Sequence, residues 1–206
     1  MIAVARLTER RIDMPAIQSV AVFCGSNPGD DPVFRRAAEA LGDGLARNGM
    51  TLVYGGGRVG LMGAVADAAL KAGGHVIGVI PEFLTRREVA HPGVSELIVT
   101  DSMHTRKTRM FELADAFVSM PGGLGTFDET IEIITWRQLR LHDKPMLICD
   151  IAGSAAPLLA MIEAAIAHGF ATDETRRLYK KVDGVAALIG KLGKLSAPAS
   201  GEAALL

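Results

Sequence analysis

The sequence predicts an α/β protein with a single doubly wound, mostly parallel sheet and helices on both of its faces. Its short apolar runs are nearly continuous and rich in β-branched and aromatic residues, which is typical of strands covered on both sides. Longer segments with helical spacing separate these runs, and this alternation favours parallel β-α-β units with right-handed crossovers. The chain has 206 residues and neither a long linker nor an internal repeat, so we expect one domain over residues 17–193. Residues 1–16 are expected to form a loose arm, and residues 194–206 a flexible tail.

The expected strands, in chain order, are residues 19–24, 51–54, 75–80, 96–99, 114–120 and 145–149. The segments with helical spacing are residues 32–48, 61–71, 103–113, 126–140 and 154–168. In folds of this kind ligands bind beyond the carboxyl ends of the strands. The residues that directly follow each apolar run are therefore the first candidates for a functional site.

The helix boundaries carry recognisable signals. The first helix has cap candidates at Asp30-Asp31, a suitable first residue in Pro32 and a stop at Asn48-Gly49. The second ends before Gly73-Gly74, and the 154–168 helix closes at His168-Gly169. These signals support the proposed alternation of strands and helices.

The composition excludes a disordered chain and argues against several classes of partner. Hydrophobic residues make up 49% of the chain and charged residues 22%. With 22 Lys and Arg against 23 Asp and Glu, and 5% aromatic residues, the chain lacks the basic field and stacking rings of a general nucleic-acid binder. No apolar run reaches the roughly 18–20 residues of a membrane span, and charges throughout residues 1–15 argue against a signal peptide or anchor. Cys24 and Cys149 lie in apolar runs without metal-binding spacing, which favours reduced, buried thiols in a cytoplasmic protein.

A glycine-rich turn follows the 51–54 strand. Gly55, Gly57 and Gly60 satisfy the G-x-G-x-x-G spacing, which is a weak signal by itself. The turn, with Gly56 and Gly57, could contact an anion or a ribose, or could serve only close helix–sheet packing. A third interpretation is a dinucleotide site, for which Glu82 is the nearest acid and lies slightly late in the sequence.

A second glycine-rich turn, after the 114–120 strand, is more informative. Gly122, Gly123 and Gly125 free the backbone to present several N–H donors at one point, and Thr126 adds a hydroxyl. The dipole of the following helix favours a nearby anion by about 0.3–1 kcal/mol. The sequence therefore predicts that this turn holds a phosphate.

Charged residues near this turn supply the candidate chemistry. Asp128 and Glu129 are expected in the first helical turn, where Asp128 suits the helix dipole and Glu129 makes chemical sense if it faces the sugar of a bound nucleotide. Arg106 and Lys107 begin the 103–113 helix and point in different directions; Arg106 suits bidentate recognition of phosphate, and Lys107 is a point charge. A solvated helix end is the alternative for this pair, and Arg109 is interpreted as structural or solvent-facing. We expect Arg106 and Glu129 to converge on one cavity at the edge of the sheet.

Four segments together resemble the LONELY GUY (LOG) family of cytokinin riboside 5′-monophosphate phosphoribohydrolases. They are MHTRK at residues 103–107, PGGLGTFDE at 121–129, ITWRQL at 134–139 and HDKP at 142–145. The resemblance runs in order over about residues 19–190 and includes CGS at 24–26 and YGGG at 54–57. It implies a Rossmann-like fold and typically a homodimer with the site near the dimer interface. The chain departs from the family pattern at Asp128, where a glutamate is common, and at Met120, where a leucine is usual.

The resemblance also implies roles for individual residues. Arg106 and Glu129 match the catalytic pair of the family. Combined with the residues after the first expected strand and in the two turns, the candidate substrate-binding residues are Gly25, Ser26, Gly56, Gly57, Glu88, Lys107, Gly122, Gly123, Leu124, Gly125, Thr126, Phe127, Asp128 and Thr135.

The residues fit this activity chemically. Cleavage of an N-glycosidic bond builds positive charge on the ribose, which a carboxylate under the sugar stabilises. We therefore predict hydrolysis of an adenine-type nucleoside 5′-monophosphate, without a metal or cofactor, giving free base and ribose 5-phosphate. The alternatives are a non-catalytic nucleotide-binding module and a dinucleotide-dependent oxidoreductase; a pyridoxal-phosphate decarboxylase lacks a persuasive Schiff-base lysine.

Overall fold

The computed structural model describes residues 16–86 and 89–197. The strands in these residues form a seven-stranded, wholly parallel sheet in the order β4-β3-β2-β1-β5-β6-β7. Their bounds are β1 (Ser19–Phe23), β2 (Thr51–Tyr54), β3 (Val76–Pro81), β4 (Glu96–Thr100), β5 (Ala116–Ser119), β6 (Met146–Asp150) and β7 (Lys180–Asp183). The predicted α/β fold with a parallel sheet is confirmed.

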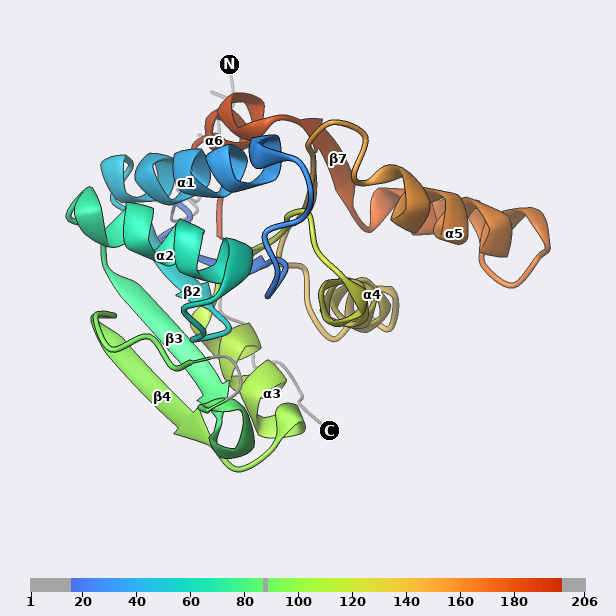
Figure 1. Ribbon diagram of the computed structural model, residues 1–206. Helices are drawn as coiled ribbons and strands as arrows, with labels where there is room; N and C mark the ends of the chain where they lie inside the picture. Colours follow the sequence, from blue (N-terminus) through green and yellow to red (C-terminus); the bar gives the residue numbers. More distant parts are fainter. Residues whose placement is uncertain (1–15, 87–88, 198–206) are drawn as a thin grey trace, which may run out of the picture.

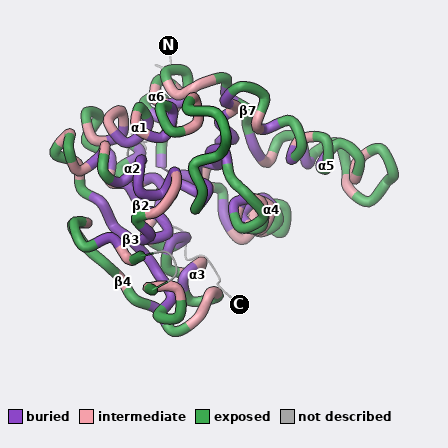
Figure 2. Tube along the Cα trace, in the orientation of Figure 1, coloured by how far each residue is buried: buried purple, intermediate pink, exposed green. Residues whose placement is uncertain are grey.

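Helices cover both faces of this sheet (Figure 1). One face is packed by α1 (Pro32–Arg47), α2 (Gly60–Lys71) and α6 (Val185–Leu192), and the other by α3 (Met103–Leu113), α4 (Leu124–Gln138) and α5 (Ala156–Ala167). Two short 3-10 helices, η1 (Glu82–Leu84) and η2 (Asp173–Arg177), complete the described elements. The central strands lie between these two layers, and β5 is buried along its whole length. The same is true of β3, which can be followed in Figure 2.

The helix signals in the sequence act as expected in α1. The Asp31 carboxylate caps this helix by accepting a hydrogen bond from the Val33 N–H at 2.8 Å. At the other end, Asn48 is the C-cap, and its side-chain amide donates to the Gly44 carbonyl at 2.8 Å. None of the helices in residues 16–86 and 89–197 is both long and apolar enough to cross a membrane.

The last strand–helix unit, β7 and α6, was not among the predicted elements. The β7 sequence, KKVD, has one apolar residue, Val182, which is also the buried residue of the strand. As an edge strand, β7 has one neighbour and needs no continuous apolar run, so the pattern that revealed the other strands was absent. The expected arm at residues 1–16 and tail at 194–206 lie mostly outside the described residues.

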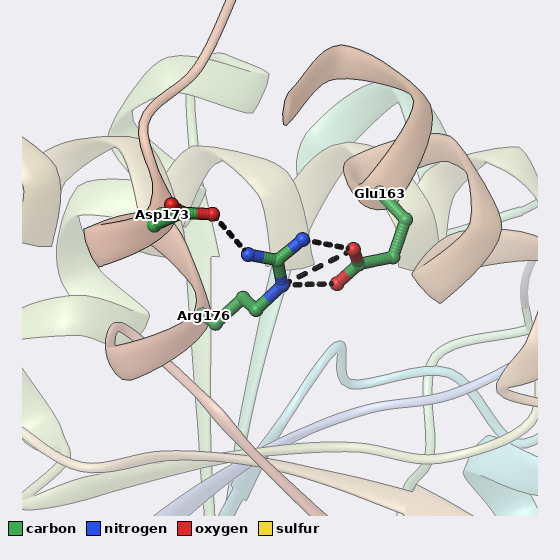
Figure 3. Close-up of polar contacts among 3 residues, drawn as sticks. All are labelled: Glu163, Asp173 and Arg176. Atoms are coloured by element: carbon green, nitrogen blue, oxygen red, sulfur yellow. Dashed lines mark hydrogen bonds and ion pairs between the residues drawn. The ribbon is translucent and has the colours of Figure 1, made fainter. Parts of the chain in front are cut away.

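The turn after α5 is held to the helix by ion pairs. Figure 3 shows the Arg176 guanidinium, from η2, between the carboxylates of Glu163 on α5 and Asp173. The Nε atom of Arg176 donates to Glu163 at 2.9 Å, and this hydrogen bond lowers the pKa of the Glu163 carboxyl. The pairs fix the course of the chain from α5 into β7.

The strand order decides where a ligand can bind. The chain leaves β1 toward β2, β3 and β4 on one side and later returns to β5 on the other side of β1. The connections after β1 and β5 therefore diverge to opposite faces of the sheet, and a crevice opens between them at the carboxyl ends of these two strands.

Candidate active site

A cavity of about 490 Å³ occupies this crevice between the ends of β1 and β5. The turns after both strands and the start of α4 contribute most of its walls, and α1, α2 and α3 contribute single side chains or short segments. The lining residues are Cys24, Gly25, Ser26, Asn27, Pro28, Gly29, Phe34, Leu61, Met62, Arg106, Pro121, Gly122, Gly123, Leu124, Gly125, Thr126, Glu129 and Ser154.

The two turns meet backbone to backbone. The Gly25 N–H donates to the Pro121 carbonyl at 3.0 Å, and a Cβ atom at Gly25 would lie 3.3 Å from the Gly122 Cα. A Cβ atom at Gly122 would lie 2.1 Å from the Thr126 Oγ1 and 2.9 Å from the Gly25 nitrogen. Glycine is required at both positions because side chains would separate the turns.

The start of α4 is presented to the cavity by this turn. Gly123 is the N-cap, in an extended conformation, and no side chain caps the helix there. Farther along, the Thr130 hydroxyl donates to the Thr126 carbonyl at 2.7 Å and lies 2.8 Å from the Ser119 hydroxyl at the end of β5. The helix is thereby anchored to the strand with its first amides directed at the cavity wall, an arrangement that suits an anion.

The helix begins earlier than predicted, and this corrects the placement of two acids. Leu124 and Gly125 are already helical, so Asp128 and Glu129 lie in the second turn of α4 rather than the first. The first turn of α4 therefore contains no acidic residue. Glu129 lines the cavity, whereas Asp128 is 62% exposed and pairs with Lys107.

The Arg106 side chain extends from α3 to the cavity. Its side chain is buried, with 5% of the residue exposed. The Nε atom donates to the Val79 carbonyl of β3 at 3.1 Å, and Nη2 donates to the Gly55 carbonyl after β2 at 3.1 Å. The guanidinium is therefore held by a carbonyl group of β3 and by one in the turn after β2, beside the cavity that it lines.

Arg106 and Glu129 line the same cavity, together with the Cys24 thiol. Burial raises the pKa of Cys24 well above its usual value, the charge of Glu129 raises it further, and the charge of Arg106 opposes the shift. The thiol is therefore protonated and is a poor nucleophile at neutral pH. Because both charges act on the pKa of Cys24, both side chains lie near this thiol in the cavity.

Several predicted site residues lie outside the cavity lining. The Lys107 ammonium is 3.3 Å from Asp128 and 3.0 Å from Glu132, so it joins α3 to α4. Burial opposes the charge of Lys107, but the bonds to Glu132 and Asp128 raise its pKa overall. Phe127 packs on the apolar core, and Thr135 is exposed with its hydroxyl bonded to the Ile131 carbonyl.

Gly56 and Gly57, in the first glycine-rich turn, also lie outside the cavity lining. Gly56 and Gly57 are buried; the Gly56 carbonyl accepts from the His91 N–H at 2.9 Å, and Gly57 forms a bridge with Ala90. Glu88 lies outside the described residues. Arg109 pairs with Glu112 at the surface, as predicted.

Among the cavity-lining side chains that were not selected from the sequence are Phe34, Leu61, Met62 and Ser154. Ser154 lies in the loop after β6, where the rule about carboxyl ends of strands would have found it. The other three come from α1 and α2, and no local pattern separates them from core residues. In the described parts of the chain, no cluster of three or more His, Cys, Asp or Glu could hold a metal ion.

Comparison with known proteins identifies the family of the chain. A family model described as "Possible lysine decarboxylase" matches residues 62–192. A protein of Rhodococcoides fascians named cytokinin riboside 5′-monophosphate phosphoribohydrolase is 47% identical over 179 residues, which cover 85% of this chain and 90% of that protein. The chain belongs to the LONELY GUY family.

Plant members of the LONELY GUY family are also similar to the chain. An Arabidopsis thaliana protein named cytokinin riboside 5′-monophosphate phosphoribohydrolase is 40% identical over 173 residues, covering 84% of this chain and 81% of the plant protein. Among solved structures, a molybdenum cofactor binding protein of Rippkaea orientalis superimposes with a TM-score of 0.66 and 22% identity over 86% of this chain and 96% of the other. At that identity the likeness concerns the fold alone.

Proposed function

We propose that this member of the LONELY GUY family hydrolyses the N-glycosidic bond of an adenine-type nucleoside 5′-monophosphate. The products are the free base and ribose 5-phosphate. The observation that carries the proposal is the presence of the Glu129 carboxylate and the Arg106 guanidinium on one cavity beside an amide-rich turn. Relatives named for the same reaction on cytokinin riboside 5′-monophosphates support it.

The substrate phosphate binds at the turn formed by residues 122–126. The first amides of α4 and the positive end of its dipole favour an anion there. Arg106, which lines the same cavity, adds a positive charge, and its guanidinium geometry suits phosphate oxygens. Binding of this remote group holds the ribose in place and contributes to the rate of the chemical step.

Glu129 acts at the sugar. As the bond between the base and the anomeric carbon breaks, positive charge develops on the ribose ring, and the carboxylate stabilises it. Water supplies the oxygen that bonds to the anomeric carbon, and its proton balances the charge of the leaving base. Glu129 lies one turn beyond the phosphate-binding turn on the same helix, so a single rigid element positions both groups.

The decarboxylase named in the family model finds no support in this cavity. A pyridoxal-phosphate enzyme uses a lysine for its Schiff base. Among the described residues, the cavity lining includes no lysine, and the neighbouring Lys107 is paired with two carboxylates. The residues do not fit that cofactor.

We further propose a cytoplasmic homodimer that accepts AMP, a prenylated adenine nucleotide or both. Both cysteines are unpaired thiols, which supports a reducing compartment. Leu124, the first residue of α4, and Leu139, its C-cap, are 86% and 63% exposed. Large exposed apolar side chains at both ends of one helix favour self-association beside the site. Residues 17–193 are proposed to act as one catalytic unit.

Product analysis tests the proposed function directly. The purified chain is incubated with AMP and separately with isopentenyladenosine monophosphate, and the products are separated by chromatography. We expect free base and ribose 5-phosphate in equal amounts from at least one substrate. Binding of AMP without release of adenine would instead identify a nucleotide-binding module, and a fluorescence titration with a nicotinamide cofactor tests the oxidoreductase alternative.

A further inference from the structure

Gly55 is in close contact with the Arg106 guanidinium. The Gly55 carbonyl accepts from Nη2 at 3.1 Å, and a Cβ atom on Gly55 would lie only 2.1 Å from the same Nη2 and 3.3 Å from Cζ. The third near neighbour of that Cβ is the Met62 sulfur, at 3.0 Å, which is a flexible side chain. A methyl group at position 55 would therefore displace the guanidinium.

The other glycines of this turn have a different reason to be glycine. Gly56 and Gly60 have φ values of +76° and +58°, which disfavour any side chain, and a Cβ on Gly60 would also collide with the Ser26 backbone at 2.3 Å. Gly55 has no positive φ of this kind. The backbone at position 55 would accept alanine, so the demand for glycine comes from Arg106.

The peptide that holds the guanidinium is itself fixed. The His91 N–H donates to the Gly56 carbonyl at 2.9 Å, and the Arg58 N–H donates to the Val89 carbonyl at 2.9 Å. The residues that directly follow the Gly55 carbonyl are thus tied to the segment after η1. A rigid acceptor and an empty Cβ position together define one place for the Arg106 side chain.

We propose that Gly55 is a positioning residue for Arg106. The turn after β2, whose spacing suggests a phosphate-binding loop, instead positions the Arg106 guanidinium. The Gly55 carbonyl accepts a hydrogen bond from it, and the guanidinium occupies the space that a side chain at position 55 would fill. The inference rests on the proposed function only in assigning Arg106 an action on the substrate phosphate. The contact between Gly55 and the Arg106 guanidinium can be tested without measuring activity.

A double-mutant cycle tests the proposal, with Gly55→Ala, Arg106→Ala, the double variant and Gly190→Ala as a matched control. A Cβ on Gly190 would meet nothing within 4 Å, so this control adds a methyl group without a clash. Two quantities are measured for each protein: kcat/KM for AMP and for adenosine, and the urea midpoint of unfolding.

We expect Gly55→Ala to lower kcat/KM for AMP by about 100-fold, the effect of a misplacement near 1 Å. The preference for AMP over adenosine should fall with it, because the displaced group acts on the phosphate. In the Arg106→Ala background the same change should alter kcat/KM by less than about twofold, since coupled residues are not additive. Gly190→Ala should retain the activity of the unchanged protein.

The urea midpoint separates the two proposals if no activity is found. Gly55→Ala should lower the midpoint when Arg106 is present and lower it much less in the Arg106→Ala protein. If Gly55→Ala alone does not fold, the double variant should fold. Equal losses in both backgrounds, or a Gly55→Ala enzyme with unchanged preference for AMP, would overturn the proposal.

Discussion

Replacing Glu129 by glutamine probes the proposed chemistry with the smallest change of shape. Glutamine keeps the length and volume of the side chain and removes its negative charge. Glu129 is only partly buried and lines the cavity, so the neutral amide requires no repacking of the core. We expect the variant to fold and to bind AMP, because the proposed phosphate contacts come from the turn of residues 122–126 and from Arg106.

The magnitude follows from what the carboxylate does. A preorganised group that stabilises charge developing in the transition state contributes roughly 10²–10³ in kcat, or about 2.7–4 kcal/mol of barrier. In this cavity the loss is aggravated, because Arg106 remains as a positive charge near a ribose that becomes positive. We therefore expect kcat to fall by at least about 10³-fold, with a much smaller change in KM.

The assay is release of adenine from AMP, followed by chromatography, with Glu132→Gln as the control. Glu132 lies on the same helix three residues later, pairs with Lys107 and does not line the cavity. The control makes the identical chemical change and should keep nearly full activity. Turnover by Glu129→Gln at the rate of the unchanged protein would refute the role of this carboxylate.

Three further changes test other parts of the structure. Arg106→Ala should reduce the preference for AMP over adenosine by about 10–100-fold, as loss of charge-assisted hydrogen bonds predicts; an unchanged kcat/KM ratio would place the phosphate elsewhere. Burial lowers the pKa of His142, so the unfolded chain binds more protons below about pH 6.5 and native stability is lost as the pH falls. His142→Phe should flatten that fall in urea denaturation at pH 7.5 and 5.5, and an equally steep fall would contradict this assignment. Gly42→Ala places a Cβ 2.1 Å from the Val65 carbonyl where α1 crosses α2, and we expect a loss of about 1–3 kcal/mol in the free energy of unfolding; Gly190→Ala, measured alongside, should lose little.

Local signals were sufficient for most of the elements. Runs of apolar, β-branched residues identified the five central strands because central parallel strands are covered on both faces. The apolar run of residues 97–99 also identified β4, although it is an edge strand and is largely exposed. Asp31 and Asn48 marked the ends of α1 because capping depends on nearby residues alone. The same reasoning failed at the edge strand β7, whose stability comes from one neighbour, and at the start of α4, where two helical residues precede the expected boundary.

The chemistry of the site was also readable from residue types. The PGGLGTFDE segment combines amides, a helix start and an acid within one turn of each other, so local geometry already relates a phosphate to Glu129. Arg106 could be singled out as a cation at the end of a strand. What the sequence could not provide was the distance between these two residues.

That distance is a property of the strand order. Residues 106 and 129 come from helices that follow β4 and β5, and three other strands lie between these two in the sheet. Only the long reach of the Arg106 side chain past the Val79 and Gly55 carbonyls brings its charge to the cavity beside β1. The sequence by itself determined the local elements and the chemical groups available to the site, because secondary-structure propensity and hydrophobic periodicity act over a few residues. Tertiary structure decided which of them meet and gave the first glycine turn a guanidinium as its neighbour, because contacts between distant segments depend on how the whole sheet is assembled.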